Sequence, residues 1–321
     1  MTMLEVQNLS VSYLTEDQEE LNAVENVSFR LEAGRSLGIV GESGCGKTTT
    51  ILALMRLLPE AGRIKAGRIH FHDKELLQIS EADMRCVRWC EISMVFQGAM
   101  NSLNPVRTIE SQIVEALLKH NQADTKQQAR QRTADLLEMV GIASERGKQY
   151  PHQYSGGMRQ RAFIAMALAC NPQILIADEP TTALDVMIQA QIIQLLKKLQ
   201  EEFDLTLILV THDLGVVAEL CDDVLVMYGG KVAEYASSDT IYNAAKHPYT
   251  RRLLRAFPDV DHLDADLVSI PGVPPRLDDF PLGCRFSPRC HVCKDRCKRD
   301  TPPLVEIEDH HYVACHMYSR K

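Results

Sequence analysis

Long apolar runs and an excess of basic charge are both missing from this chain. No window approaches the ~18 uncharged apolar residues of a membrane-spanning helix, because Asn171 and Pro172 interrupt the longest candidate, residues 162–177. Lysine and arginine number 35 against 43 aspartates and glutamates, and the formal net charge is −8. This balance excludes a strong electrostatic case for binding nucleic acid, which needs a basic surface.

A leader pattern and internal repeats are missing as well. The first ten residues alternate like a strand and lack the basic and apolar regions of a signal peptide, so we expect a soluble, cytosolic chain. No low-complexity tract occurs. The length of 321 residues, with 45% hydrophobic and 24% charged residues, is typical of a globular protein of roughly two domains at ~150 residues each.

Cysteines are present in number but unevenly distributed. Five of the ten are scattered before residue 283, and the others crowd the end of the chain: Cys284, Cys290, Cys293, Cys297 and Cys315. In a reducing compartment, such a group favours metal or cluster ligation over disulfides. The shift in composition predicts a separate C-terminal module.

Short apolar runs alternate with amphipathic segments along the first 235 residues. Buried strands are predicted at residues 36–40, 174–177, 205–210 and 224–227, and an amphipathic helix at residues 186–203. Strands that alternate with helices imply a mainly parallel sheet covered on both faces. Residues 98–160 lack a strong strand signal and predict a helical insertion in that sheet domain.

A glycine-rich loop lies between a predicted buried strand and a predicted helix. Residues 41–48 fit the pattern G-x-x-x-x-G-K-[ST] in full, and this context disfavours a chance glycine turn. Backbone N–H groups and the helix N-terminus favour phosphate in such a loop. Lys47 would reach the β- and γ-phosphates, and the Thr48 hydroxyl would bind Mg²⁺. The residues expected to hold the nucleotide are Gly41, Glu42, Ser43, Gly44, Cys45, Gly46, Lys47, Thr48 and Thr49.

Two carboxylates end the predicted strand at residues 174–177. Asp178 can hold the Mg²⁺ shell, and Glu179 is then placed to polarise an attacking water. Alone, an acidic turn facing solvent is an equally good interpretation. The phosphate loop upstream favours the catalytic one.

The segment between these two elements carries a family resemblance. Residues 154–161 read Tyr-Ser-Gly-Gly-Met-Arg-Gln-Arg and resemble the L-S-G-G-Q signature of ATP-binding cassette (ABC) ATPases. The departures at Tyr154 and Met158 resemble those of the dipeptide/oligopeptide-permease subfamily. The Q-loop, the D-loop and the switch-histidine loop are matched at Gln97, Asp185 and His212. Tyr13 lies where the family stacks an aromatic on adenine, although ordinary surface packing is an equal alternative.

The resemblance implies an α/β fold, a P-loop ATP-binding cassette over residues 1–235. It would combine a RecA-like, mainly parallel sheet, an antiparallel β part and a helical subdomain at about 98–165. ATP and Mg²⁺ are the implied cofactors, with Thr48, Gln97 and Asp178 near the metal. Catalysis would use Glu179, His212 and Gln97. In a head-to-tail dimer, the signature would complete the partner's ATP site through Ser155, Gly156, Gly157 and Met158.

Residues 236–321 resemble the C-terminal extension of peptide-permease ATPases. The matching segments begin at His247-Pro248-Tyr249-Thr250 and at Ile270-Pro271-Gly272. Some members carry a [4Fe–4S] cluster here, and the four recurring positions map onto Cys284, Cys290, Cys297 and Cys315. The extra Cys293 leaves the ligand set open. Zn²⁺, bound by cysteines alone or with nearby histidines, is the rival, and unliganded thiols are the third interpretation.

The resemblance also implies a function, that of the ATP-hydrolysing subunit powering the import of di- and oligopeptides. The implied partners are a second ATPase subunit in a heterodimer, two membrane permease subunits, and a periplasmic or extracellular solute-binding protein. The chain would sit peripherally on the cytoplasmic face of the (inner) membrane. One alternative is nickel or another small solute as cargo. The other is a soluble cassette ATPase of translation or repair, against which stand the single cassette and the lack of heptads.

Overall fold

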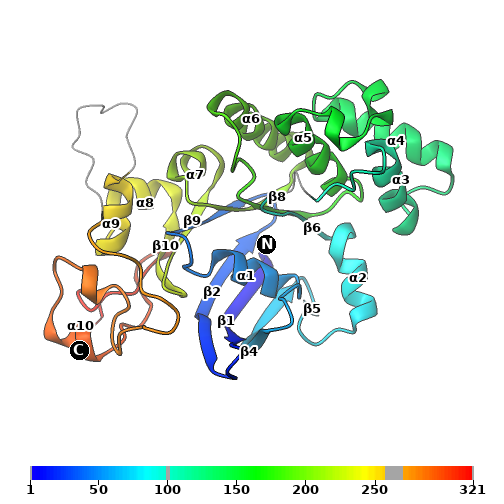
Figure 1. Ribbon diagram of the computed structural model, residues 1–321. Helices are drawn as coiled ribbons and strands as arrows, with labels where there is room; N and C mark the ends of the chain where they lie inside the picture. The colour runs from blue at the N-terminus through cyan, green and yellow to red at the C-terminus, as the bar shows by residue number, and fades with distance from the viewer. Residues whose placement is uncertain (1, 99–101, 257–269, 320–321) are drawn as a thin grey trace. The chain divides into compact units, whose positions relative to one another are not determined.

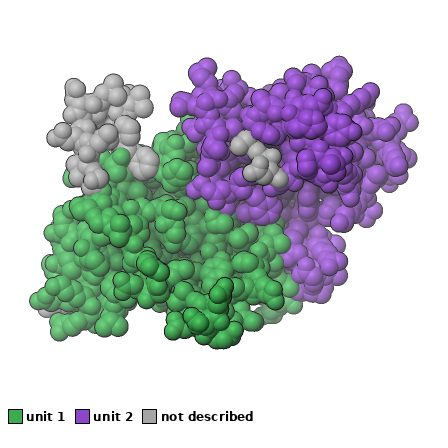
Figure 2. All heavy atoms as spheres, in the orientation of Figure 1, with its two compact units in different colours: residues 1–32, 36–78, 210–321 green, residues 33–35, 79–209 purple. Residues whose placement is uncertain are grey.

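The computed structural model describes residues 2–98, 102–256 and 270–319. The chain divides into two compact units (Figure 2). Unit 1 comprises Met1–Glu32, Ser36–Gln78 and Val210–Lys321, and unit 2 comprises Ala33–Arg35 and Ile79–Leu209. The end of the chain therefore shares a unit with the phosphate loop. The expected boundary after residue 235 does not coincide with either unit's edge, and it stays a prediction.

An antiparallel sheet of four strands forms one part of unit 1, in the order β2-β1-β4-β5 (Figure 1). Its strands are β1 (Thr2–Leu14), β2 (Glu20–Glu32), β4 (Gly62–Phe71) and β5 (Lys74–Glu75). Val6 of β1 lies opposite Phe29 of β2 and Ile69 of β4, and all three side chains are buried. This buried row arises because alternate residues of a strand point to the same face of the sheet.

A second set of strands in unit 1 runs in the order β11-β12-β10-β9-β3. The strands are β3 (Ser36–Val40), β9 (Asp223–Tyr228), β10 (Lys231–Ser237), β11 (Val305–Glu308) and β12 (His311–Val313). β3 and β9 are parallel, as expected, and both are buried throughout. β10 returns antiparallel to β9 after a turn at Gly229-Gly230. β12 then pairs with β10, so the C-terminal segment adds its own strands to this sheet.

The helices of unit 1 are short. They are α1 (Lys47–Leu54), α7 (Leu214–Leu220), α8 (Ser238–Ala244), α9 (Pro248–Arg255) and α10 (Asp295–Arg299). α1 ends at Leu54 because Arg56 adopts a positive φ of 51° ahead of Pro59.

Among its described residues, unit 2 combines parallel strands with five α-helices. β6 (Ile92–Val95) and β7 (Ile174–Asp178) are parallel, and β8 (Thr206–Thr211), which begins in this unit, adjoins β7. The helices are α2 (Glu81–Cys90), α3 (Ile109–Lys119), α4 (Lys126–Met139), α5 (Gly156–Ala167) and α6 (Val186–Phe203). Between β6 and β7 the described residues form helices and turns, as the predicted helical insertion requires. Within the described part of the chain, no helix is long and apolar enough to span a membrane.

Candidate functional site

The phosphate loop of unit 1 has the backbone that phosphate binding requires. β3 ends at Val40, directly before Gly41, and α1 begins after Gly46, which has a φ of 100°. Such a φ strains any residue with a Cβ. A Cβ on Gly41 would lie 2.2 Å from the Met227 carbonyl oxygen. Glycine is therefore required at both positions by the fold itself.

Lys47 folds back over this loop. Its Nζ donates to the carbonyl oxygens of Gly41 at 2.7 Å and Glu42 at 3.1 Å, and its side chain is buried. Ser43, Gly44 and Thr48 are exposed beside it. The ammonium group is thus held at the loop, where a phosphate oxygen can replace the carbonyl oxygens as acceptor.

Tyr13 lies beside the same loop, and Cys45 lies within it. Tyr13 is half-buried, and its Oη shares a hydrogen bond of 3.2 Å with Thr49 Oγ1. Tyr13 therefore lies close to the loop, and its stacking on adenine stays a prediction. Burial raises the pKa of the Cys45 thiol, which agrees with an inert residue that contributes its backbone.

Sequence reasoning missed the partners of Glu42. Both carboxylate oxygens accept hydrogen bonds from Arg289, and the Glu42 N–H donates to Tyr249 Oη at 3.0 Å. Both partners lie in segments already noted for their family likeness. The pairing itself is invisible in the sequence, because more than 200 residues separate the partners.

The acidic pair of unit 2 follows a fully buried strand. Asp178, the last residue of β7, is 1% exposed. Glu179 has a φ of 45°, and its Oε2 accepts hydrogen bonds from Gln97 Nε2 at 2.8 Å and from Thr182 Oγ1 at 2.9 Å. The structure thus brings together Gln97 and Glu179, which the sequence predicts to act in catalysis. A residue held in a strained backbone by side-chain contacts is typical of functional sites.

The signature and the D-loop both occupy helix N-termini in unit 2. Ser155 caps α5 by accepting from the Met158 N–H at 3.3 Å, and Asp185 caps α6 by accepting from the Ile188 N–H at 3.0 Å. Ser155 and Asp185 are exposed. A Cβ on Gly157 would lie 2.5 Å from Ile188 Cγ2, so the signature requires a glycine where α5 approaches α6. The start of α5 carries the partial positive charge that favours an anion.

His212 directly follows β8 and is exposed. The next residue, Asp213, caps α7 through the N–H groups of Gly215 at 2.9 Å and Val216 at 3.4 Å. This cap fixes the turn on which His212 sits. Its role as a switch stays a prediction.

Four tail cysteines face one small cavity in unit 1. A cavity of about 20 Å³ is lined by Cys284, Cys290, Cys297 and Cys315, but not by Cys293. The Cys293 thiol lies 3.6 Å from the Lys294 carbonyl oxygen and donates to it. The pKa of Cys284 is raised to about 11, mainly by burial. A hydrogen bond from the Phe286 main chain acts in the opposite direction, and the nearby Cys297, Cys290 and Cys315 add to the rise as like charges.

The cysteine side chains that line this cavity are of the kind that ligates an iron–sulfur cluster or Zn²⁺. Among the described residues, no group of three or more histidine, cysteine or acidic side chains is close enough to hold a metal ion. The histidines beside the cavity are engaged elsewhere. His247 Nδ1 accepts from the Tyr249 N–H at 3.0 Å, burial lowers the pKa of His247 to about 4, and His316 Nε2 lies 2.8 Å from the Asp300 carbonyl oxygen.

Two family models match the chain. The model described as ABC transporter matches residues 24–182, a range that holds the phosphate loop, the signature and the acidic strand. The model described as oligopeptide/dipeptide transporter, C-terminal region, matches residues 233–297. The second match ends before Cys315.

Curated relatives are similar along their whole length. The chain is 48% identical over 322 residues to the dipeptide transport ATP-binding protein DppD of Bacillus subtilis (strain 168), covering 99% of this chain and 96% of the relative. It is 46% identical over 318 residues to the DppD of Escherichia coli (strain K12), covering 98% and 97%. It is also 46% identical over 323 residues to the oligopeptide transport ATP-binding protein AppD of Bacillus subtilis, covering 100% and 98%.

Solved structures share the fold. A dimeric ATP-binding cassette in a post-hydrolysis state, bound to ADP and Pi, matches with a TM-score of 0.65 at 30% identity, covering 74% of this chain and 99% of that chain. CbiO1 from Clostridium perfringens, described as part of an ABC transporter complex, matches with a TM-score of 0.64 at 28% identity, covering 76% and 91%. These likenesses confirm the expected cassette fold.

Proposed function

This chain belongs to the ATP-binding subunits of dipeptide and oligopeptide ABC transporters, and we infer from that membership that it hydrolyses ATP to drive the import of peptides. The observation that carries the inference is the similarity of 46–48% over the whole chain, tail included. A cassette that acts outside transport is disfavoured, because relatives named for peptide transport match to within a few per cent of both full lengths.

Within this function, residues 41–48 hold the phosphates of ATP. Lys47 supplies a charged donor to the β- and γ-phosphates, and its two hydrogen bonds to loop carbonyl oxygens support that placement. Thr48 and Asp178 are the residues that would hold Mg²⁺, together with Gln97. Mg²⁺ would neutralise charge that develops on the phosphates.

Glu179 acts as the general base in hydrolysis. Its carboxylate takes a proton from the water that attacks the γ-phosphorus, and the bond from that phosphorus to the bridging oxygen breaks to leave ADP and phosphate. The hydrogen bonds from Gln97 and Thr182 orient the carboxylate. The switch-histidine motif places His212 beside the γ-phosphate in the same reaction.

The signature acts on the nucleotide of a partner subunit, in a head-to-tail dimer. Support comes from the exposure of Ser155 and Asp185 at two helix N-termini. Val186 and Met187 are 79% and 73% exposed beside Asp185, which is unusual for apolar residues unless a partner covers them. A second, different ATPase chain is the proposed partner, with two permease subunits in the membrane and a solute-binding protein outside.

Peptide-stimulated ATPase activity tests this function. With its second ATPase chain, both permease subunits and the binding protein in proteoliposomes, the complex is expected to hydrolyse ATP faster when a dipeptide or short oligopeptide is supplied. The binding protein without peptide is the control. Stimulation by Ni²⁺ with no response to any peptide would show that the cargo is a small solute. A chain that assembles with no permease would contradict a transport role.

For the tail, the proposed ligands of a [4Fe–4S] cluster are Cys284, Cys290, Cys297 and Cys315. The same four thiols line one cavity and Cys293 does not, which supports this set. The engagement of His247 Nδ1 and His316 Nε2 disfavours a mixed cysteine and histidine zinc site.

Iron analysis of anaerobically purified protein tests this set. We expect a brown protein with about four irons per chain, and lower iron content with serine at any one of the four positions. The matched control is Cys293→Ser, which should retain iron because Cys293 lies off the cavity. Stoichiometric zinc without iron, in protein made anaerobically with ample iron, would refute the cluster.

A further inference from the structure

A buried arginine of the tail reaches into the phosphate loop. Arg289 ends the short 3₁₀ turn Ser287–Arg289, and its side chain is only 4% exposed. Its Nη1 donates to Glu42 Oε2 at 2.6 Å, and its Nη2 donates to Glu42 Oε1 at 3.0 Å. This two-pronged contact matches the planar guanidinium to the carboxylate and fixes the orientation of both groups.

The rest of unit 1 fixes the guanidinium from other sides. Nε donates to the Pro271 carbonyl oxygen at 2.9 Å, Nη2 to the Ile270 carbonyl oxygen at 3.3 Å, and Nη1 to Tyr228 Oη at 3.2 Å. Burial alone would lower the pKa of Arg289, but the hydrogen bonds to Glu42 and Tyr228 outweigh it and raise that pKa. The arginine is therefore charged and held in one place.

Glu42 is the second residue of the loop, and its main chain is also fixed. Its N–H donates to Tyr249 Oη at 3.0 Å, and its carbonyl oxygen accepts from Lys47 Nζ at 3.1 Å. A carboxylate in a loop that binds several phosphates repels them unless a positive charge neutralises it. Arg289 pairs with this carboxylate.

We propose that Arg289 is a positioning residue for ATP, which neutralises Glu42 and holds the phosphate loop in its binding conformation. The cysteine-rich tail is then part of the ATP site. This inference rests on the proposed role of residues 41–48 in holding ATP. It assigns Arg289 no contact with the nucleotide, because the effect passes through Glu42.

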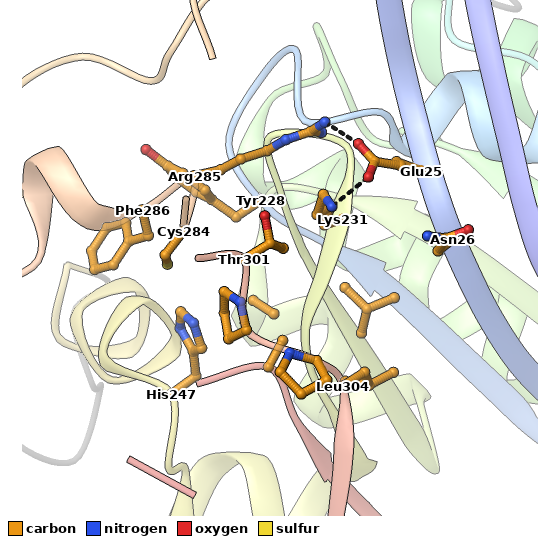
Figure 3. Close-up of a pocket in the computed structure, with 15 residues that line it drawn as sticks. Glu25, Asn26, Tyr228, Lys231, His247, Cys284, Arg285, Phe286, Thr301 and Leu304 are labelled. Carbon is orange, nitrogen blue, oxygen red and sulfur yellow. Dashed lines mark hydrogen bonds and ion pairs between the residues drawn. The ribbon is translucent and has the colours of Figure 1, made fainter. Parts of the chain in front are cut away.

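A second tail arginine provides a matched comparison. Arg285 is also buried, and it donates to the Gly229 carbonyl oxygen and to Glu25 on β2. Lys231 Nζ donates to Glu25 as well, at 2.6 Å, and Figure 3 shows both cations directed at that carboxylate. Loss of Arg285 therefore weakens the attachment of the tail but leaves Glu25, which lies outside the loop, with a positive partner.

The test is the ATP dissociation constant of the full chain, measured by isothermal titration for each variant. Arg289→Met should weaken ATP binding about tenfold or more. The reason is that the Glu42 carboxylate, left without its positive partner, then repels the phosphates of ATP. Arg289→Met/Glu42→Gln should bind ATP more tightly than Arg289→Met, because the carboxylate that lost its positive partner is removed as well. Arg285→Met should stay within about twofold of the parent, because it leaves no carboxylate unpaired.

Several results would overturn the proposal. The first is an ATP affinity of Arg289→Met within twofold of the parent. The second is a double variant that binds ATP no more tightly than Arg289→Met, and the third is a loss of ATP affinity in Arg285→Met as large as that in Arg289→Met. If Arg289→Met does not fold, Arg289→Lys keeps the charge without the two-pronged contact, and should bind ATP more weakly than the parent. Parent-like binding by Arg289→Lys would then count against it.

Lys47→Ala separates this inference from its premise. If Lys47→Ala binds ATP as the parent does, the assignment of the loop fails, and the inference fails with it. If Lys47→Ala loses ATP while Arg289→Met retains it, the loop assignment stands and the role of Arg289 alone is wrong.

Discussion

Glu179→Gln lowers ATP turnover by about 10²–10⁴-fold and leaves ATP bound, since this is the usual loss when a general base is removed. The substitution removes the proton acceptor and little volume. Its amide oxygen can still accept from Gln97 and Thr182, which now donate to Glu179 Oε2 at 2.8 and 2.9 Å. The contacts around residue 179 are therefore retained, and a dimer closed on ATP should accumulate.

Phosphate release from the assembled complex, with the partner's own site inactivated, measures this effect. Size-exclusion chromatography with ATP then reports the trapped dimer. Glu201→Gln is the matched control, because it makes the same exchange on an exposed position of α6. Near-normal turnover by Glu179→Gln under these conditions would remove Glu179 from catalysis.

Lys47→Ala weakens ATP binding to the isolated chain by about a hundredfold. Hydrogen bonds to charged groups contribute about 1.5–3 kcal/mol each, and about 1.4 kcal/mol corresponds to tenfold in affinity. The ammonium group is already directed at the loop by its contacts with Gly41 and Glu42, so little rearrangement precedes the contact with phosphate. Equilibrium binding of ATP measures the loss.

Two other variants serve as comparisons for Lys47→Ala. Lys65→Ala removes an exposed lysine that pairs with Glu20 on the antiparallel sheet of the same unit, and should bind ATP as the parent does. Ser155→Ala should also leave the affinity of the isolated chain near the parent value but impair the ATPase of the assembled complex. If Ser155→Ala weakened ATP binding as much as Lys47→Ala, the head-to-tail arrangement would be wrong.

The cysteine-rich tail contacts the phosphate loop directly. Composition alone predicts a module apart from the cassette, because the cysteines crowd beyond residue 283. In the structure, β12 pairs with β10, and Arg289 holds the carboxylate of Glu42. Substitutions in the tail are therefore expected to act on stability, and a substitution at Arg289 is expected to act on ATP affinity as well, so each needs the control that separates the two effects.

Local chemistry was readable from the sequence wherever neighbouring residues carry it. Residues 41–48 specify a phosphate loop because its glycines, lysine and threonine are adjacent, and α6 occupies the predicted residues 186–203 because its apolar period and its Asp185 cap are local. The cassette family followed from such motifs in their order along the chain. None of them depends on knowing which distant segments meet.

Only the tertiary structure decided which separated residues come together. It placed Gln97 against Glu179, selected four of the five tail cysteines around one cavity, and joined Arg289 to Glu42 across 247 positions of sequence. An isolated arginine or glutamate in a sequence reads as a solvated surface charge. Burial is what turns this pair into a specific contact, because a charge removed from water must find its partner within the fold.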